Sequence, residues 1–152
     1  MAGDFQAQAL PVTGTEHWTA KQAGGEKVRL FMWRKRTQNS PKGTVLFVHG
    51  YPLDRTLWQH QLGALTGFRR IAPDLRGLGL SDAPDLGYSM ATYADDLAAL
   101  LDQLEVPRVT LLGFSMGGMA AADFAVRFRQ RLSGLALVGT SAAAEELVRV
   151  AE

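Results

Sequence analysis

The sequence predicts an α/β fold with a mostly parallel sheet of about six strands and helices on both faces. Three observations lead to this prediction. Short apolar runs alternate along the chain with amphipathic helical segments, which is typical of right-handed β-α-β crossovers. Loops rich in glycine follow several of these runs, where helices of such folds begin. Two segments of alternating polarity near the N-terminus predict an antiparallel hairpin at one edge of the sheet.

The first half of the chain supplies the hairpin and two core strands. Residues 1–14 are polar and interrupted by proline and glycine, so we expect a loose lead-in followed by one domain over 15–152. The run Thr44–Val48 is uninterrupted and β-branched at both ends, as expected of a strand that is buried on both faces. The predicted elements are strands at 15–21, 28–35 and 44–48, a helix at 55–65, and a strand at 69–74.

The second half contains the clearest helix, which we expect from Tyr93 to Leu104. Ser89 precedes it as a candidate cap, and Pro107 lies beyond its end. Apolar residues recur along it at helical spacing, so it packs by one face. The remaining predicted elements are a strand at 109–112, a helix at 116–129, a strand at 135–138 and a helical tail at 142–152.

Composition excludes several classes of function. The chain has 152 residues, with 16 Lys and Arg against 15 Asp and Glu, so its net charge of +1 gives no electrostatic reason to bind nucleic acid or an anionic membrane. The absence of cysteine excludes disulfides and thiolate metal sites. No leader pattern and no apolar stretch of about 18 residues are present, so we expect a cytoplasmic protein without a membrane anchor.

The strongest motif is a serine between glycines at the end of a predicted strand. Gly113, Ser115 and Gly117 form the pattern GxSxG, in which a tight corner holds the serine in a strained backbone conformation and presents its hydroxyl. Ser115 would also open a helix, where free N–H groups favour an oxyanion. We expect the Met116 N–H to be one donor and the Tyr51 N–H, after the His49-Gly50 loop, to be the second.

Three segments together resemble the α/β-hydrolase family, especially its esterase, enol-lactonase and cofactor-free haloperoxidase branch. The resemblance runs from about residue 15 to 142 in the family's order. It implies Ser115 as nucleophile, Tyr51 and Met116 amides as oxyanion hole, small esters or lactones as substrates, and no metal or cofactor. A serine at this corner argues against relatives that open epoxides. The matching segments are FVHGYPLD at 47–54, APDLRGLGLSD at 72–82 and GFSMGG at 113–118.

The chain departs from this family after the sixth core strand. Family members continue into a lid, two more strands, an acid and a histidine, so we interpret the chain as a truncated α/β-hydrolase fold. No histidine follows Ser115. The candidate bases are therefore His49, which is favoured as a brace of the oxyanion turn, and His60; His17 and His60 both have the character of surface residues.

Other polar residues near the expected site have both structural and functional interpretations. Asp54 and Asp82 are favoured as turn caps. Glu145, beside Glu146, is a candidate acid, but a charged helical face explains both equally well. Arg76 is favoured as a buried brace over a substrate anchor. Leu53, Trp58 and Met119 are the expected lining of an apolar acyl pocket.

The strand at 135–138 would leave an unprotected parallel edge, so we expect a homodimer formed through this strand and the tail from Ala142. The general base would then come from this chain, from a neighbouring copy or from water. Two alternatives remain open. The chain is either a catalytically weak or inactive module of binding or folding, or one piece of a hydrolase made from two polypeptides.

Overall fold

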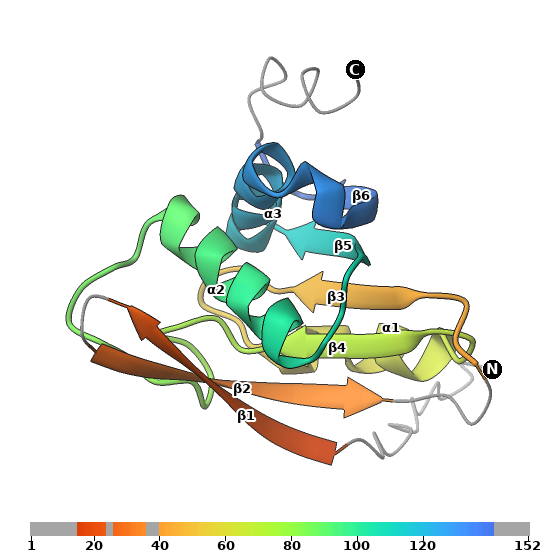
Figure 1. Ribbon diagram of the computed structural model, residues 1–152, viewed down its shortest axis with the longest axis horizontal. Coiled ribbons are helices and arrows are strands. Elements are labelled where there is room, and N and C mark those ends of the chain that lie inside the picture. Colours follow the sequence, from red (N-terminus) through yellow and green to blue (C-terminus); the bar gives the residue numbers. More distant parts are fainter. Residues whose placement is uncertain (1–14, 24–25, 36–39, 142–152) are drawn as a thin grey trace, which may run out of the picture.

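A computed structural model describes residues 15–23, 26–35 and 40–141 and confirms the predicted α/β architecture (Figure 1). Its six strands form one sheet in the order β1-β2-β4-β3-β5-β6. The expected lead-in at 1–14 and tail at 142–152 lie outside the described residues. The strands are β1 (Thr15–Ala23), β2 (Glu26–Lys35), β3 (Thr44–Val48), β4 (Arg69–Pro73), β5 (Val109–Phe114) and β6 (Leu132–Val138). The helices are η1 (Arg55–Trp58), α1 (Gln59–Ala64), α2 (Met90–Gln103), α3 (Met116–Arg127) and η2 (Arg129–Arg131).

The strand directions bring four carboxyl ends to one edge of the sheet. β4, β3, β5 and β6 run parallel to one another, whereas β2 pairs antiparallel with both β1 and β4. The loops that leave β3, β4 and β5 therefore meet at the same edge. Ligands of open parallel sheets bind in the crevice at such an edge.

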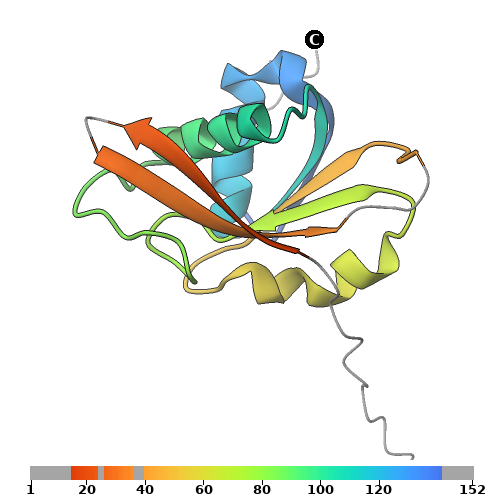
Figure 2. The same cartoon turned by 60° about the horizontal axis from the view of Figure 1, so that its bottom comes forward.

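Alternating side chains of the central strands build a core on each face of the sheet. Leu46 and Val48 of β3 join a large cluster with residues of α2 and α3, while Val45 and Phe47 join a smaller cluster that includes Leu62 of α1. Figure 2 shows α1 on one face and α2 and α3 on the other. The prediction of helices on both faces is confirmed.

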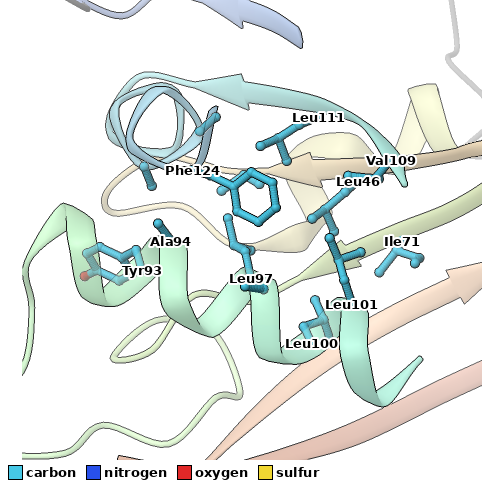
Figure 3. Close-up of a cluster of buried hydrophobic side chains, with 14 of the residues drawn as sticks. Leu46, Ile71, Tyr93, Ala94, Leu97, Leu100, Leu101, Val109, Leu111 and Phe124 are labelled. Carbon is cyan, nitrogen blue, oxygen red and sulfur yellow. The ribbon is translucent and has the colours of Figure 1, made fainter. Parts of the chain in front are cut away.

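The larger core depends on the contact between α2 and α3. Phe124 of α3 is fully buried and lies between Leu97 of α2 and Leu111 of β5 (Figure 3). Ser89 caps α2 as predicted, because its hydroxyl accepts the Thr92 N–H at 3.1 Å. Among the described residues α2 is the longest helix, with 14 residues, and no helix combines the length and apolarity needed to cross a membrane.

Several element boundaries differ from the sequence prediction, and a local hydrogen bond accounts for the largest difference. The predicted helix at 55–65 divides into a 3₁₀ turn and α1, since the Asp54 carboxylate accepts the Thr56 N–H and tightens the first turn. α2 begins at Met90, directly after its cap, rather than at Tyr93. β6 begins at Leu132, three residues earlier than predicted, and its register slips by one residue between Val109 and Thr110.

Replacement of a buried leucine tests the account of the core. Leu97→Ala should lower the free energy of unfolding by about 2–5 kcal/mol, because it opens a cavity between α2 and the sheet. Urea unfolding monitored by circular dichroism measures this change. Leu86→Ala is the matched control, since Leu86 is 81% exposed and should shift stability by less than about 0.5 kcal/mol. Equal losses in the two variants would contradict the assignment of the core.

Candidate active site around Ser115

Ser115 lies at the corner between β5 and α3 in a strained backbone conformation. Its φ is 52° and its ψ is −121°, a region that residues with a side chain rarely adopt. The Ser115 N–H donates to the carbonyl of Val138 at 3.0 Å, and its own carbonyl accepts the Gly118 N–H at 2.9 Å. The neighbouring strand and the first turn of α3 therefore hold the conformation in place.

The glycines that flank Ser115 are required by close backbone contacts. A Cβ at Gly113 would lie 2.5 Å from the Gly117 carbonyl oxygen and 2.7 Å from the Gly118 Cα, both closer than side chains tolerate. A Cβ at Gly117 would overlap the carbonyl oxygen of His49. The predicted role of the GxSxG spacing thus has a direct steric cause, because α3 packs flush against β5 and against the end of β3.

The loop after β3 meets the same corner. A Cβ at Gly50 would lie 2.8 Å from the Cβ of Ser115 and 3.4 Å from the Met116 nitrogen. Tyr51 follows directly, and neither its N–H nor that of Met116 donates to another described residue. Met116 opens α3, where free N–H groups and the helix dipole favour negative charge. Among the described residues, the N–H groups of Tyr51 and Met116 therefore remain without a hydrogen-bond acceptor.

The imidazole of His49 is hydrogen-bonded within the fold through both of its nitrogens. Its side chain is fully buried, its Nε2 accepts the Leu75 N–H at 3.0 Å, and its Nδ1 lies 3.1 Å from the Gly50 carbonyl. Since Nε2 accepts a hydrogen bond and the ring is neutral, Nδ1 carries the ring hydrogen and donates it to the Gly50 carbonyl. Burial lowers the pKa of His49 below its ordinary value, so the ring is neutral at pH 7. Both nitrogens are occupied, which corrects its candidacy as a base and supports the brace interpretation.

The other two histidines lie away from the corner. His17 is on β1, and its Nε2 lies 2.7 Å from the Thr15 hydroxyl. Because four strand spacings separate β1 from β5 in the sheet order, His17 is about 19 Å from the strand that carries Ser115. His60 is exposed on α1, which covers the face opposite α3 (Figure 2). The structure therefore does not bring either imidazole to Ser115.

The candidate acids also have structural partners. Asp54 accepts the N–H and the hydroxyl of Thr56, at 2.8 and 2.5 Å, and thus caps η1. Asp82 binds the Arg29 guanidinium at 2.9 and 3.1 Å and the Arg29 N–H at 2.8 Å. The Arg29 hydrogen bond holds the pKa of Asp82 below its usual range. Glu145 and Glu146 lie outside the described residues.

Arg76 is a buried brace, but its partner was not expected from the sequence. Its Nε and Nη2 donate to the two carboxylate oxygens of Asp96 at 2.5 and 2.6 Å, and its Nη1 donates to the Gly87 carbonyl at 3.1 Å. This contact joins the loop after β4 to α2. The signal was present in the sequence, since Asp96 shares the apolar face of α2 with Tyr93 and Leu100 and a charge on such a face requires a partner.

The expected pocket residues divide into two groups. Leu53, Met119 and Tyr51 are 38%, 41% and 69% exposed, and thus offer apolar surface on the Ser115 corner and on the loop that meets it. Trp58 is only 6% exposed and packs in the smaller core cluster, with its ring centroid 5.4 Å from that of Phe47. The assignment of Trp58 to the pocket is corrected, because its indole serves the packing of η1 against the sheet.

Comparison with known proteins identifies a matching family and several similar proteins. Residues 43–151 match the family described as alpha/beta hydrolase fold. A non-heme chloroperoxidase of Kitasatospora aureofaciens is 46% identical over 85 residues, which cover 55% of this chain and 31% of that protein. An epoxide hydrolase of Siraitia grosvenorii is 43% identical over 95 residues, covering 60% of this chain and 30% of that one.

A solved esterase from Thermogutta terrifontis superimposes with a TM-score of 0.76 at 39% sequence identity. The superposition covers 84% of this chain and 46% of the esterase. The chain thus spans about a third of the length of the curated relatives and less than half of the solved esterase.

The burial of His49 predicts how stability depends on pH. Its pKa is lowered in the folded protein, so the unfolded chain binds more protons as the pH falls below the ordinary value near 6.5. The free energy of unfolding should therefore decrease between pH 7.5 and pH 5, as urea titrations at several pH values can measure. His49→Gln should flatten this dependence, whereas His60→Gln, at an exposed position, should leave it unchanged. If the free energy of unfolding of His49→Gln depended on pH as strongly as that of the wild type, the attribution of this dependence to His49 would be contradicted.

Proposed function

The chain belongs to the alpha/beta hydrolase family, and from this premise we propose that it carries the nucleophilic part of a serine hydrolase for small carboxylic esters. The observation that supports this most is the backbone of Ser115, with its positive φ at a strand-to-helix corner between obligatory glycines. Strain of this kind costs about 1–3 kcal/mol and is common at active sites, so it supports a catalytic task for Ser115.

The proposed reaction begins with attack of the Ser115 Oγ on the ester carbonyl carbon. The carbonyl oxygen becomes an oxyanion and accepts hydrogen bonds from the Tyr51 and Met116 amides. The C–O bond to the alcohol then breaks, the alcohol leaves with a proton, and the acyl group stays on Ser115. Water attacks this acyl ester in the second step and releases the carboxylic acid. Each amide of such a pair is worth about 3 kcal/mol in the transition state.

The proton of the Ser115 hydroxyl needs an acceptor in the first step. In the described part of the chain His49 is occupied and His17 and His60 are remote, so we propose that the acceptor is an imidazole from elsewhere or water. Sites that keep an oxyanion hole but lose the base retain about 10³–10⁴-fold acceleration over water. The described residues alone should therefore give slow turnover.

The surroundings of Ser115 favour an apolar acyl group. Tyr51, Leu53 and Met119 present exposed apolar surface, and two ion pairs of the loops at this edge, Arg76 with Asp96 and Arg55 with Asp74, are buried. A small neutral ester or lactone matches this environment better than a charged substrate. The open surface should give broad specificity among short acyl chains.

The serine assignment is tested by covalent labelling together with ester hydrolysis. The wild-type chain should react with a fluorophosphonate probe, with the adduct on Ser115 by mass spectrometry, and should hydrolyse p-nitrophenyl acetate above background. Ser115→Ala should lose both signals, because the probe and the ester share one nucleophile. Ser40→Ala replaces an exposed loop serine and should keep both.

Two results would argue against this function. Equal hydrolysis by wild type and Ser115→Ala would remove Ser115 from the mechanism. Labelling of Ser115 without any turnover would instead favour the second candidate, an acyl-binding module. The observation that favours this candidate is the occupation of both His49 nitrogens.

We further propose that β6 pairs with β6 of a second copy. Among the described strands β6 has one neighbour, β5, so one row of its backbone donors and acceptors faces outward. Edge strands that remain single usually carry charges, whereas Leu132–Val138 carries none. Two copies of this strand can therefore pair around a two-fold axis without repulsion between like charges. The side chain of Val138, which is 47% exposed, would become more buried in this dimer.

Light scattering after size-exclusion chromatography tests the pairing. The wild-type chain should elute with twice the mass of one copy, 16.5 kDa. Ser133→Lys places a charge at an exposed position of β6 and should shift the protein to the monomer mass. Ser40→Lys adds the same charge to a loop and should leave the dimer intact. A monomeric wild type would overturn the proposal.

A further inference from the structure

The loop that carries Tyr51 is attached at both ends to the same short segment. It connects β3 to η1 through residues 49–54. At its start, His49 accepts the N–H of Leu75 at 3.0 Å. At its end, Arg55 binds Asp74, the residue before Leu75, through its main chain and its side chain. The position of the loop therefore depends on the first two residues after β4.

The contact between Arg55 and Asp74 has three properties of a rigid link. The Arg55 N–H donates to one carboxylate oxygen at 2.8 Å, and its Nη1 donates to the other at 2.5 Å. The two side chains are 10% and 0% exposed, so water competes little. Asp74 also accepts the Leu80 N–H at 2.9 Å and donates its own N–H to the Phe31 carbonyl at 2.8 Å. Because the Asp74 carboxylate is held firmly, it restricts the movement of Arg55.

Aromatic rings fix the other side of the guanidinium. Its central carbon lies 4.3 Å from the ring centroid of Phe31 and 4.7 Å from that of Trp33, both on β2. Arginine can stack on aromatic rings and donate to a carboxylate at the same time, because its group is planar and always charged. A lysine at position 55 keeps the charge but loses this geometry.

The inner part of the loop transmits this restraint to the Ser115 corner. The Leu53 N–H donates to the Gly50 carbonyl at 2.9 Å, which closes a turn around Tyr51. Gly50 in turn packs so closely on the corner that a Cβ there would lie 2.8 Å from that of Ser115. A shift of the Arg55 end would therefore move the Tyr51 amide relative to the serine.

We infer that Arg55 and Asp74 are positioning residues that hold the Tyr51 amide at the distance from Ser115 that an oxyanion requires. The effect on catalysis rests on the proposed function. The restraint on the position of the Tyr51 loop does not, because it is a property of the protein without substrate. Both side chains are buried, so neither is placed to contact a substrate. Both act through the backbone of residues 50–54, where a misplacement of about 1 Å costs on the order of 100-fold in rate.

The test compares two substitutions of arginine by lysine in buried ion pairs. Arg55→Lys loosens the link to the Tyr51 loop, while Arg76→Lys loosens the equally buried pair with Asp96, which holds the loop after β4 to α2. Amide hydrogen exchange by NMR reports the turn at Leu53, and titration with phenylboronic acid, which forms a tetrahedral adduct with serine, reports the oxyanion site. Asp74→Asn is the partner variant, because its amide oxygen still accepts the Arg55 N–H.

In Arg55→Lys we expect exchange of the Leu53 amide to become about tenfold faster while amides of α2 stay unchanged. The dissociation constant for phenylboronic acid should rise about tenfold. Arg76→Lys should change each quantity by less than about twofold. Asp74→Asn should reproduce the Arg55→Lys pattern at Leu53.

Unchanged Leu53 exchange in Arg55→Lys would overturn the inference. So would faster exchange spread evenly over α2 and the loop, since that pattern reports only general loss of stability. Failure of the wild-type chain to bind phenylboronic acid would count against the proposed function instead. The exchange measurement then decides the inference alone, because it needs no reaction at Ser115.

Discussion

The strained backbone of Ser115 depends on the close packing of three segments that are distant in the sequence. β5 delivers the residue to the edge of the sheet, α3 begins without an intervening loop, and the end of β3 lies against Gly117. No single hydrogen bond holds the corner. It persists because the Val138 carbonyl, the first turn of α3 and the two cores leave no space for a relaxed alternative. The orientation of the serine hydroxyl and the direction of the Met116 amide both follow from this packing.

Buried ion pairs provide the second level of organisation. The loops after β3 and β4 have irregular backbones, so regular pairing cannot hold them. Asp74 and Asp96 are both inaccessible to solvent. Asp74, directly after β4, binds Arg55 and so fastens the end of the loop after β3, whereas Asp96 of α2 binds Arg76 and so fastens the loop after β4. Breaking a buried pair by removing one partner costs about 3–5 kcal/mol. The loops at the edge of the sheet that holds Ser115 are consequently held rigidly on the side that faces the core. Their outer side is exposed to solvent.

The fold and the strained corner at Ser115 were predictable from local signals, whereas the supporting contacts were not. The GxSxG spacing and the Ser89 cap act within a few residues of one another, and the alternating strands and helices define the sheet. The partners Arg55 and Asp74 are 19 residues apart, and their contact requires the neighbourhood of β3 and β4 to be known. Trp58 was misassigned for a similar reason, since the 3₁₀ geometry of η1 turns its indole into the core.

The steric contacts of the glycines have a practical consequence for protein engineering. Randomising residues 113–118 would mostly yield chains that fail to fold, because side chains at Gly113 and Gly117 have nowhere to go. Leu53 and Met119, by contrast, are substantially exposed, and their side chains are not packed as closely as the glycines. A combinatorial library confined to these two codons would vary exposed apolar side chains without risking the scaffold.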